Sequence, residues 1–422
     1  MPEPSDPPQV RYEPLAQNRD FKILLTSQGV SAFGDGVTFT ALPLLVLFLT
    51  GSGLMMGIVG ALQTIPDLVF GMVSGALADR TDRRRMMLLA DLGRAGLTAL
   101  IPISVVLNGP TMAVVLVVAA PMSVLRSLFL AGYTASVPAL VGRAQVGRAN
   151  SIFEAIFSMG YIIGPALAGA LSATIGPGRT LAIDAVSFGL SGLALAAVRR
   201  DLRAPIDRPR TSIVADIREG IDFILRHPLL RSMILFWGLV AITTAPLVTA
   251  LAVHITRDLG YEATILGLIL TAYGTGTVVG ALLTARIPRR GIAPFLLGGT
   301  ATTGVVLIIV ANTTLVPVLL GIAGLAGIAQ SMVLVTYLTA RTAHSPDVLL
   351  GRIGSTARTI SLGLQPLGLL VGGALIDLTN GSTTIAIMGI TLLVLTAAFS
   401  PLAALRRGSV MPSARPEASA RP

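Results

Sequence analysis

The chain has 422 residues, of which 53% are hydrophobic and 12% are charged, and its mean hydropathy is +0.79. A soluble domain of this length could not cover its surface with so few charges, which excludes an ordinary soluble enzyme, and the apolar content also excludes a disordered scaffold. The absence of cysteine excludes thiol catalysis, a disulfide-built domain and cysteine-based metal sites.

Apolar runs long enough to cross a membrane as helices, which takes about 20 residues, recur along the chain. They number about twelve, at residues 22–49, 54–78, 86–107, 111–136, 150–175, 179–198, 231–256, 262–285, 292–311, 314–340, 353–377 and 382–405. A transmembrane strand barrel would show two-residue alternation instead of continuous apolar runs. We therefore expect an all-α polytopic membrane protein with twelve transmembrane helices.

Basic residues gather at one end of these predicted helices. Most of the 31 lysines and arginines lie near the N-terminus, in the loops after the second, fourth and eighth spans, in the central loop, at the start of span eleven and in the tail. The positive-inside rule then places both termini in the cytoplasm. The polar start does not resemble a signal peptide, so we expect a multi-pass protein of the cell membrane. This topology accounts for the net charge of +10 without a nucleic-acid partner.

The chain divides into two halves at its longest polar stretch between spans. Within that stretch Ile213, Ile217, Ile221 and Ile224 form one apolar stripe, which predicts an amphipathic helix lying on the membrane surface. The predicted parts are an N-terminal cytoplasmic tail, a six-helix bundle, a cytoplasmic linker with this helix, a second six-helix bundle and a disordered tail, at residues 1–21, 22–198, 199–230, 231–407 and 408–422.

The two halves also repeat each other in sequence. Residues 146–171 align without a gap to residues 350–375, so that Gly169 coincides with Gly373. Because each half contains an even number of spans, both halves enter the membrane in the same orientation. Such parallel repeats are an arrangement found in secondary transporters.

The loop after the second span contains a recognisable motif. It reads Gly75-Ala-Leu-Ala-Asp79-Arg80-Thr-Asp82-Arg83 and resembles the major facilitator signature G-x-L-A-D-R-x-G-R-K, with Asp82 in place of a glycine. The resemblance implies the major facilitator fold of two six-helix pseudo-symmetric bundles, with a cytoplasmic gate at this loop. A carboxylate at a helix end can bind the positive N-terminus of a facing helix and nearby guanidinium groups. The alternative is a basic loop that only sets topology.

Two further charges are assigned to the same gate. Glu154, near the start of the fifth span, is expected to pair with Arg83 or its neighbours. Arg358, at the start of the eleventh span, is expected to pair with Asp79. Together these pairs would hold the cytoplasmic side shut and open when the bundles rock.

The fifth span contains a glycine motif. Gly160-x-x-x-Gly164-Pro165-x-x-Ala168-Gly169 resembles the G-x-x-x-G-P-x-x-G-G motif of drug/proton antiporters, with Ala168 replacing one glycine. Small residues four apart let helices approach closely, and proline bends a helix. Plain helix packing remains the alternative, and the resemblance favours export.

Shorter pieces narrow the resemblance to one branch. The segments 138–143, 182–185 and 350–353, together with the amphipathic central helix, resemble the group that holds the macrolide-efflux proteins and the enterobactin exporter. The resemblance extends over roughly residues 20–407. It implies efflux of small amphiphilic molecules of the drug or siderophore type.

Charged residues inside the spans are costly and are therefore functional candidates. Asp35, Asp67 and Arg126 lie near the midplane of the first, second and fourth spans, and their repeat partners in the second half are neutral. They are the candidates for proton coupling, with Asp35 as the main proton carrier. The alternatives are a fixed Asp35–Arg126 ion pair and a structural hydrogen bond of Asp67. Asp184 is expected to be an interfacial carboxylate without a transport role.

Two other pairs of polar residues are expected to be structural, and the sequence does not decide which aromatic side chains face the cavity. Asp91 and Arg94 read as a local pair, and His254 with Asp258 lacks the further ligands that a metal would need. Candidate cavity aromatics are Phe33, Phe39, Phe129, Tyr133, Trp237, Tyr273 and Tyr337.

The expected function is proton-coupled efflux by a multidrug-type antiporter that alternates access through rocking of its two bundles. We find no phosphate-binding glycine loop, and we expect no cofactor, no metal and no enzymatic activity. The expected partners are a small-molecule substrate, protons and the lipid bilayer, and the protein is expected to be a monomer. The alternatives are an uptake symporter of the same fold and a non-transporting membrane sensor or assembly partner.

Overall fold

A computed structural model describes residues 13–202, 213–286, 291–346 and 349–410 of the chain. Most of both predicted tails, residues 1–12 and 411–422, lies outside the described residues. In chain order the longer helices are α1 (Arg19–Thr50), α2 (Gly53–Ala78), α3 (Arg83–Val106), α4 (Thr111–Val141), α5 (Val146–Ile175), α7 (Ala182–Ala196), α8 (Ile213–Arg226), α9 (Pro228–Thr244), α11 (Ala263–Arg286), α12 (Ala293–Asn312), α13 (Val316–Ala343), α14 (Leu350–Leu378) and α15 (Gly381–Phe399). The short elements are η1 (Arg143–Gln145), α6 (Pro177–Thr180), α10 (Leu247–Val253), the π-turn η2 (His254–Asp258) and α16 (Ala403–Arg407).

Twelve candidate membrane spans are present in the described part of the chain, at the positions that the apolar runs predict. The sixth span consists of α6 and α7, and the seventh of α9, α10 and η2. The last span ends at Phe399, earlier than residue 405, because Pro401 has no N–H and disfavours helical backbone at the residue before it. The third span begins earlier than expected because Asp82 caps α3.

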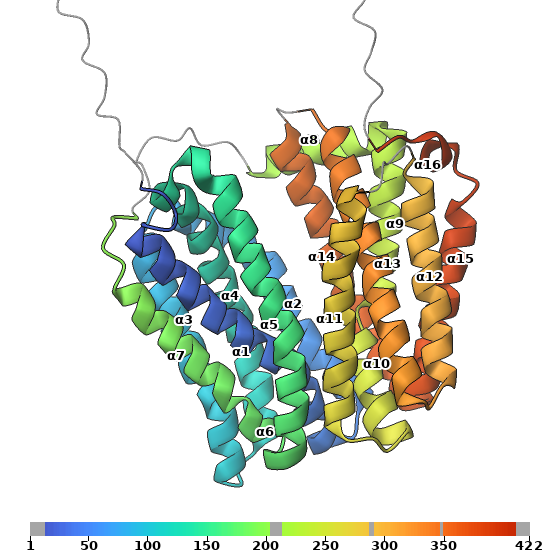
Figure 1. Ribbon diagram of the computed structural model, residues 1–422, viewed down its shortest axis with the longest axis horizontal. Coiled ribbons are helices and arrows are strands. Elements are labelled where there is room, and N and C mark those ends of the chain that lie inside the picture. Colours follow the sequence, from blue (N-terminus) through green and yellow to red (C-terminus); the bar gives the residue numbers. More distant parts are fainter. Residues whose placement is uncertain (1–12, 203–212, 287–290, 347–348, 411–422) are drawn as a thin grey trace, which may run out of the picture.

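The spans form two bundles that lie side by side (Figure 1). In the first, α1 packs on α5 and α7, while α3 packs on α4 and α7; in the second, α11 packs on α13, and α12 on α13 and α15. The bundles touch through α2 with α14 and through α5 with α11. We call the end at which α1, α3, α5 and α14 begin the basic end, because the arginine-rich loops lie there, and the opposite end the far end.

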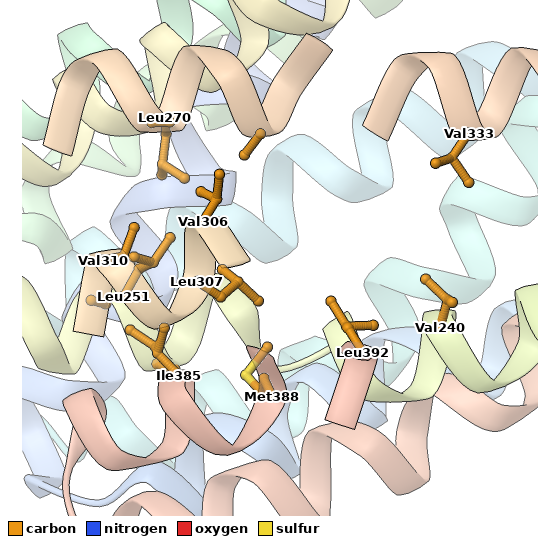
Figure 2. Packing of buried hydrophobic residues seen from close by; sticks show 14 of the residues in the cluster. Val240, Leu251, Leu270, Val306, Leu307, Val310, Val333, Ile385, Met388 and Leu392 are labelled. Carbon is orange, nitrogen blue, oxygen red and sulfur yellow. The ribbon is translucent and has the colours of Figure 1, made fainter. Parts of the chain in front are cut away.

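The second bundle is held together by a dense aliphatic core. Figure 2 shows part of it, where Val306, Leu307 and Val310 of α12 face Ile385 and Met388 of α15. All five side chains are at most 5% exposed. Since lipid tails are as apolar as these side chains, close packing rather than water exclusion favours helix association inside the membrane.

The amphipathic helix α8 lies on the second bundle at the basic end, against α9 and α14 (Figure 1). Glu219 of α8 forms an ion pair with Arg352 of α14, and a Cβ at Gly220 would lie 2.7 Å from the Thr356 hydroxyl, so the two helices are in close contact. Ile224 of the predicted stripe is buried, whereas Ile221 remains 41% exposed. Helix α8 therefore belongs physically to the second bundle.

The bundles approach most closely in their far halves. A Cβ at Gly53 would lie 2.8 Å from the Gly373 carbonyl oxygen, and one at Gly169 would lie 2.6 Å from that of Ala263. At the basic ends of α2 and α5, by contrast, Gly75 and Gly147 have open space around them. The two bundles are thus in contact at the far end and diverge toward the basic end (Figure 1).

Candidate functional site

A cavity of about 350 Å³ lies between the two bundles. The first bundle contributes most of its wall, from α1, α2, α3, α4, α5 and α7. The second bundle closes it with Val248 and Thr249 of α10 and with Gln365 and Leu369 of α14. A pocket of this size between helices of two bundles can hold a small organic molecule.

All three predicted proton-coupling residues line this cavity. Asp35 comes from α1, Asp67 from α2 and Arg126 from α4, and two further charged residues, Arg94 and Asp184, join them. The cavity wall therefore carries three carboxylates and two guanidinium groups, all contributed by the first bundle. The positions of the second half that align with Asp35, Asp67 and Arg126 in the repeat are neutral, which agrees with the placement of the cavity charges on the first bundle alone.

Arg126 is paired with Asp67 rather than with Asp35. Its Nη2 lies 3.0 Å from the Asp67 Oδ2, and the Arg126 side chain is 55% exposed while that of Asp67 is 14% exposed. An ion pair at this exposure stabilises a protein only slightly, by about 0–1 kcal/mol. The Arg126 guanidinium therefore remains available to a ligand in the cavity.

Asp35 has no hydrogen bond or ion pair to any residue in the described ranges. Its neighbours in sequence, Gly34 and Gly36, bring α1 into contact with α7 and α5, because a Cβ on either would meet atoms of those helices. Arg94 and Arg126 act on the Asp35 carboxylate as the nearby positive charges. Asp35 is thus a half-buried carboxylate that faces the cavity without a fixed partner.

Asp184 does not lie where the sequence analysis placed it. It is 1% exposed instead of interfacial, accepts a hydrogen bond from the Thr38 hydroxyl at 2.5 Å and another from the Ser187 hydroxyl at 3.2 Å, and lines the cavity. The charge of Asp35 acts on the Asp184 carboxylate. The span begins at Pro177 and α7 turns this carboxylate toward Gly34 of α1. A location near the end of an apolar run does not reveal that direction.

Arg94 and Asp91 form the predicted local pair, and the structure gives this pair a second role. Asp91 also accepts a hydrogen bond from the Ser191 hydroxyl at 2.5 Å. The Arg94 guanidinium lies over the rings of Phe129 and Phe188, at 4.6 and 4.2 Å from their centroids. Aromatic faces stabilise a cation at such distances. Arg94 is therefore held rigidly at the cavity wall.

The motif at the basic end ties the first bundle together in this structure. Arg83 is 6% exposed, donates to the carbonyl oxygens of Ala78 at 3.0 Å and Ala135 at 3.1 Å, and lies 3.5 Å from the Asp79 carboxylate. Asp82, the departure from the family signature, accepts hydrogen bonds from the N–H groups at the start of α3. Its carboxylate thus caps α3.

The other gate candidates are exposed and apart. Arg80, Glu154 and Arg358 make no ion pair within the described residues, and Asp79 is bound to Arg83 instead of Arg358. The lack of these ion pairs agrees with the separation of the two bundles at the basic end. The pairs expected for a shut gate therefore remain predictions, and they apply to a conformation in which the basic end is closed.

At the far end the structure contains a contact that sequence reasoning missed. Asp377, at the end of α14, accepts hydrogen bonds from the Ser52 hydroxyl at 2.6 Å, the Gly53 N–H at 2.5 Å and the Leu54 N–H at 3.0 Å. A carboxylate of the second bundle thereby caps helix α2 of the first, where the helix dipole favours negative charge. We call these four residues the far-end clasp.

The glycine motif of the fifth span serves two separate contacts. A Cβ at Gly160 or Gly164 would lie within 2.7 Å of backbone atoms of α1, whereas Gly169 contacts α11 of the other bundle. Pro165 presents its carbonyl oxygen to Gly267 of α11. The first half of the motif therefore packs one bundle internally, and the second half lies in the interface between the bundles.

The remaining polar pair does not form a larger cluster. His254 is 2% exposed, and its Nδ1 lies 3.6 Å from the Asp258 carboxylate. Within the ranges that the structure describes, no group of three or more His, Cys, Asp and Glu side chains could hold a metal ion.

Comparisons with known proteins agree with this architecture. The chain matches the family model described as "Transmembrane secretion effector" over residues 10–418. It is 30% identical over 385 residues to the multidrug efflux pump Tap of Mycolicibacterium fortuitum, with 88% of this chain and 93% of that protein covered. It is 27% identical over 350 residues to the enterobactin exporter EntS of Citrobacter koseri, with 81% of this chain and 82% of that protein covered. These matches are to transporters rather than enzymes and confirm the resemblance drawn from the motifs.

Solved structures share the fold at low sequence identity. The nucleoside transporter NupG matches with a TM-score of 0.74 at 12% identity, covering 91% of this chain and 100% of that one. A bacterial homologue of the human lysosomal transporter Spinster, in an inward-facing and unoccupied conformation, matches with a TM-score of 0.69 at 16% identity, covering 91% and 96%. The likeness at such identities concerns the fold alone.

Proposed function

Since the chain belongs to the transmembrane secretion effector family of the major facilitator superfamily, we propose that it is a proton-coupled exporter of small amphiphilic molecules. The observation that carries the proposal is the cavity between the bundles, with its charged wall supplied by one bundle only. The similarity to a multidrug efflux pump and to an enterobactin exporter supports export rather than uptake.

Transport proceeds by rocking of the two bundles around this cavity. The basic end faces the cytoplasm, by the positive-inside rule, so the conformation described above admits substrate from inside the cell. Opening of the far end requires release of the far-end clasp and of the close contacts of Gly169. Closure of the basic end brings Asp79 and Glu154 toward arginines of the motif and of α14.

Asp35 carries the exchangeable proton. Asp67 is bound to Arg126 and Asp184 to Thr38 and Ser187, whereas Asp35 has no such partner in the described part of the molecule. Two neighbouring carboxylates titrate as a coupled pair, so the proton on Asp35 depends on the state of Asp184. Entry of substrate, or movement of Arg94 and Arg126 relative to Asp35, then couples proton release to transport.

The direct test begins with cells that lack or overproduce the protein. A panel of drugs and siderophores identifies compounds to which the deletion strain becomes sensitive, and retention of a fluorescent drug reports lost export. Poorer growth of the deletion strain on a nutrient, with normal dye export, would indicate an uptake symporter instead.

The coupling step is tested with the best-exported compound in proteoliposomes under an imposed pH gradient. Asp35→Asn should retain binding, lose its pH dependence and lose export driven by the gradient. Asp222→Asn, which changes an exposed aspartate of α8 outside the cavity, should transport at the parent rate. Gradient-driven export by Asp35→Asn at the parent rate would refute this assignment and transfer it to Asp67.

A further inference from the structure

A second cavity, of about 440 Å³, lies inside the second bundle between α9, α13 and α14. It adjoins the first cavity, because Leu362 and Gln365 of α14 line both. Its other end reaches Arg341 and Arg358, near the basic end of the molecule. In this conformation the second cavity therefore extends from the central cavity toward the basic end.

One wall of the second cavity is a stacked aromatic pair. The ring of Trp237 lies nearly parallel to that of Tyr337, with centroids 5.0 Å apart and planes inclined by 14°. Tyr337 is 2% exposed and fixes the position of the indole ring, which is itself half-buried. A planar ring entering the cavity would find a preorganised flat surface, which reduces the entropy lost on binding.

The same cavity is basic and contains no acidic lining residue. The Arg341 guanidinium lies 5.4 Å from the Tyr337 centroid and 3.8 Å from the position of a Cβ at Gly354. Neither Arg341 nor Arg358 makes an ion pair with any residue in the described ranges, whereas Arg94 and Arg126 of the first cavity are each paired with an aspartate.

An unpaired guanidinium beside an aromatic surface is complementary to an anionic group on a flat ring. Arginine can bind a carboxylate or a similar oxyanion through two parallel hydrogen bonds, and it can also stack on rings. The amide side chains of Gln330 and Gln365 supply further hydrogen-bonding groups in the same wall. The lining thus offers stacking, charge and hydrogen bonds together.

We propose that the second cavity is a binding subsite for an anionic aromatic group, held by Arg341 and Arg358 and stacked on Trp237. This rests on the proposed function, since it names the chemistry of one end of the exported molecule. Amphiphiles that carry a carboxylate or a comparable oxyanion on a ring are then bound in preference to their neutral analogues.

Trp237 allows a direct measurement, because it is the only tryptophan of the chain. Quenching of its fluorescence is titrated in the purified full-length protein with 4-nitrobenzoate and with the uncharged analogue 4-nitrobenzamide. The carboxylate should bind roughly tenfold to hundredfold more tightly, as charge-assisted hydrogen bonds predict. Arg341→Gln should strongly reduce that preference, leaving only the contribution of Arg358, and Arg341→Lys should retain more of it.

The matched control is Arg352→Gln, which removes an arginine of α14 that is paired with Glu219 and does not line the cavity. It should bind both compounds like the parent. Equal binding of the two compounds by the parent protein, or an unchanged preference in folded Arg341→Gln, overturns the subsite.

The binding assay needs no proton gradient, so its outcome is separate from that of export. Preferential binding of the carboxylate by both the parent and Asp35→Asn supports the subsite even where gradient-driven transport is absent. Normal export without that preference overturns the subsite and leaves the proposed function standing.

Discussion

The far-end clasp allows a quantitative test of what stabilises the conformation with the far end closed over the one with the far end open. Asp377→Ala removes the carboxylate that caps α2 from the opposite bundle, and with it the acceptor for one hydroxyl and two backbone N–H groups. These contacts exist only while the far end is closed. The substitution should therefore destabilise the closed far end without weakening either bundle internally.

The size of the effect follows from helix capping. Loss of a capping side chain costs about 0.5–2 kcal/mol. Because Asp377 is exposed and screened by water, we take about 1 kcal/mol, which corresponds to a roughly fivefold shift toward the conformation with the far end open. A shift of this size is measurable wherever the minor conformation is populated at a few per cent.

Distances between spin labels provide the assay in this cysteine-free chain. Labels at Ile175→Cys of α5 and Glu262→Cys before α11 sit on opposite bundles at the far end, and Asp377→Ala should increase the population at long distance. Asn380→Ala is the matched control, because Asn380 caps α15 within its own bundle through the Thr383 N–H at 2.7 Å. An identical distance distribution in the parent and in folded Asp377→Ala would refute the clasp.

Three other predictions concern the interface, the cavity and the surface helix. Gly169→Ala should shift the same label distances toward the open far end, because overpacking against α11 costs about 1–3 kcal/mol. The control is Gly164→Ala: Gly164 packs within one bundle, so this substitution should lower thermal stability without changing the label distances. Arg126→Gln should insert normally and reduce proteoliposome transport at least tenfold, since its exposed ion pair contributes about 0–1 kcal/mol to folding; normal export by this variant would make the charge dispensable. Burial and the adjacent His344 lower the pKa of His227 below the ordinary histidine value of 6.5. Neutral His227 therefore stabilises the docking of α8 above that pH, and the stabilisation is lost as the pH falls through the lowered pKa. The protection factors of the α8 amides against hydrogen exchange should fall on acidification of the parent, and this fall should be smaller in His227→Gln.

Part of the charged site could be predicted from the position of each charged residue within its membrane span. Asp35, Asp67 and Arg126 lie in the middle of long apolar runs, where a charge is tolerated only if it faces a cavity or a partner. All three line the cavity. Asp184 lies close to the end of its run, where water could have satisfied it. Its burial depends on the rotation of α7 against α1, which only packing determines.

The ion-pair and hydrogen-bond partners of these charged residues could not be predicted from the sequence either. Arg126 pairs with Asp67 of α2 because α2 and α4 pack together, while Asp35 on α1 has no ion-pair partner among the residues that the structure describes. In the sequence, Asp377 is an ordinary polar residue at a helix end. Its capping contact is apparent only from the position of α2 of the other bundle. Such contacts depend on the relative position of whole helices, which local sequence patterns do not encode.

The membrane-spanning helices, their number and the family follow from the amino-acid sequence alone, because a backbone in lipid must satisfy its hydrogen bonds within each apolar run and because the motifs are local. The packing of the helices against each other determines which charges meet, which glycines lie between the bundles and which end is closed. Two bundles joined by small residues and a few polar contacts can pack in more than one way, so the same residues are compatible with either end open.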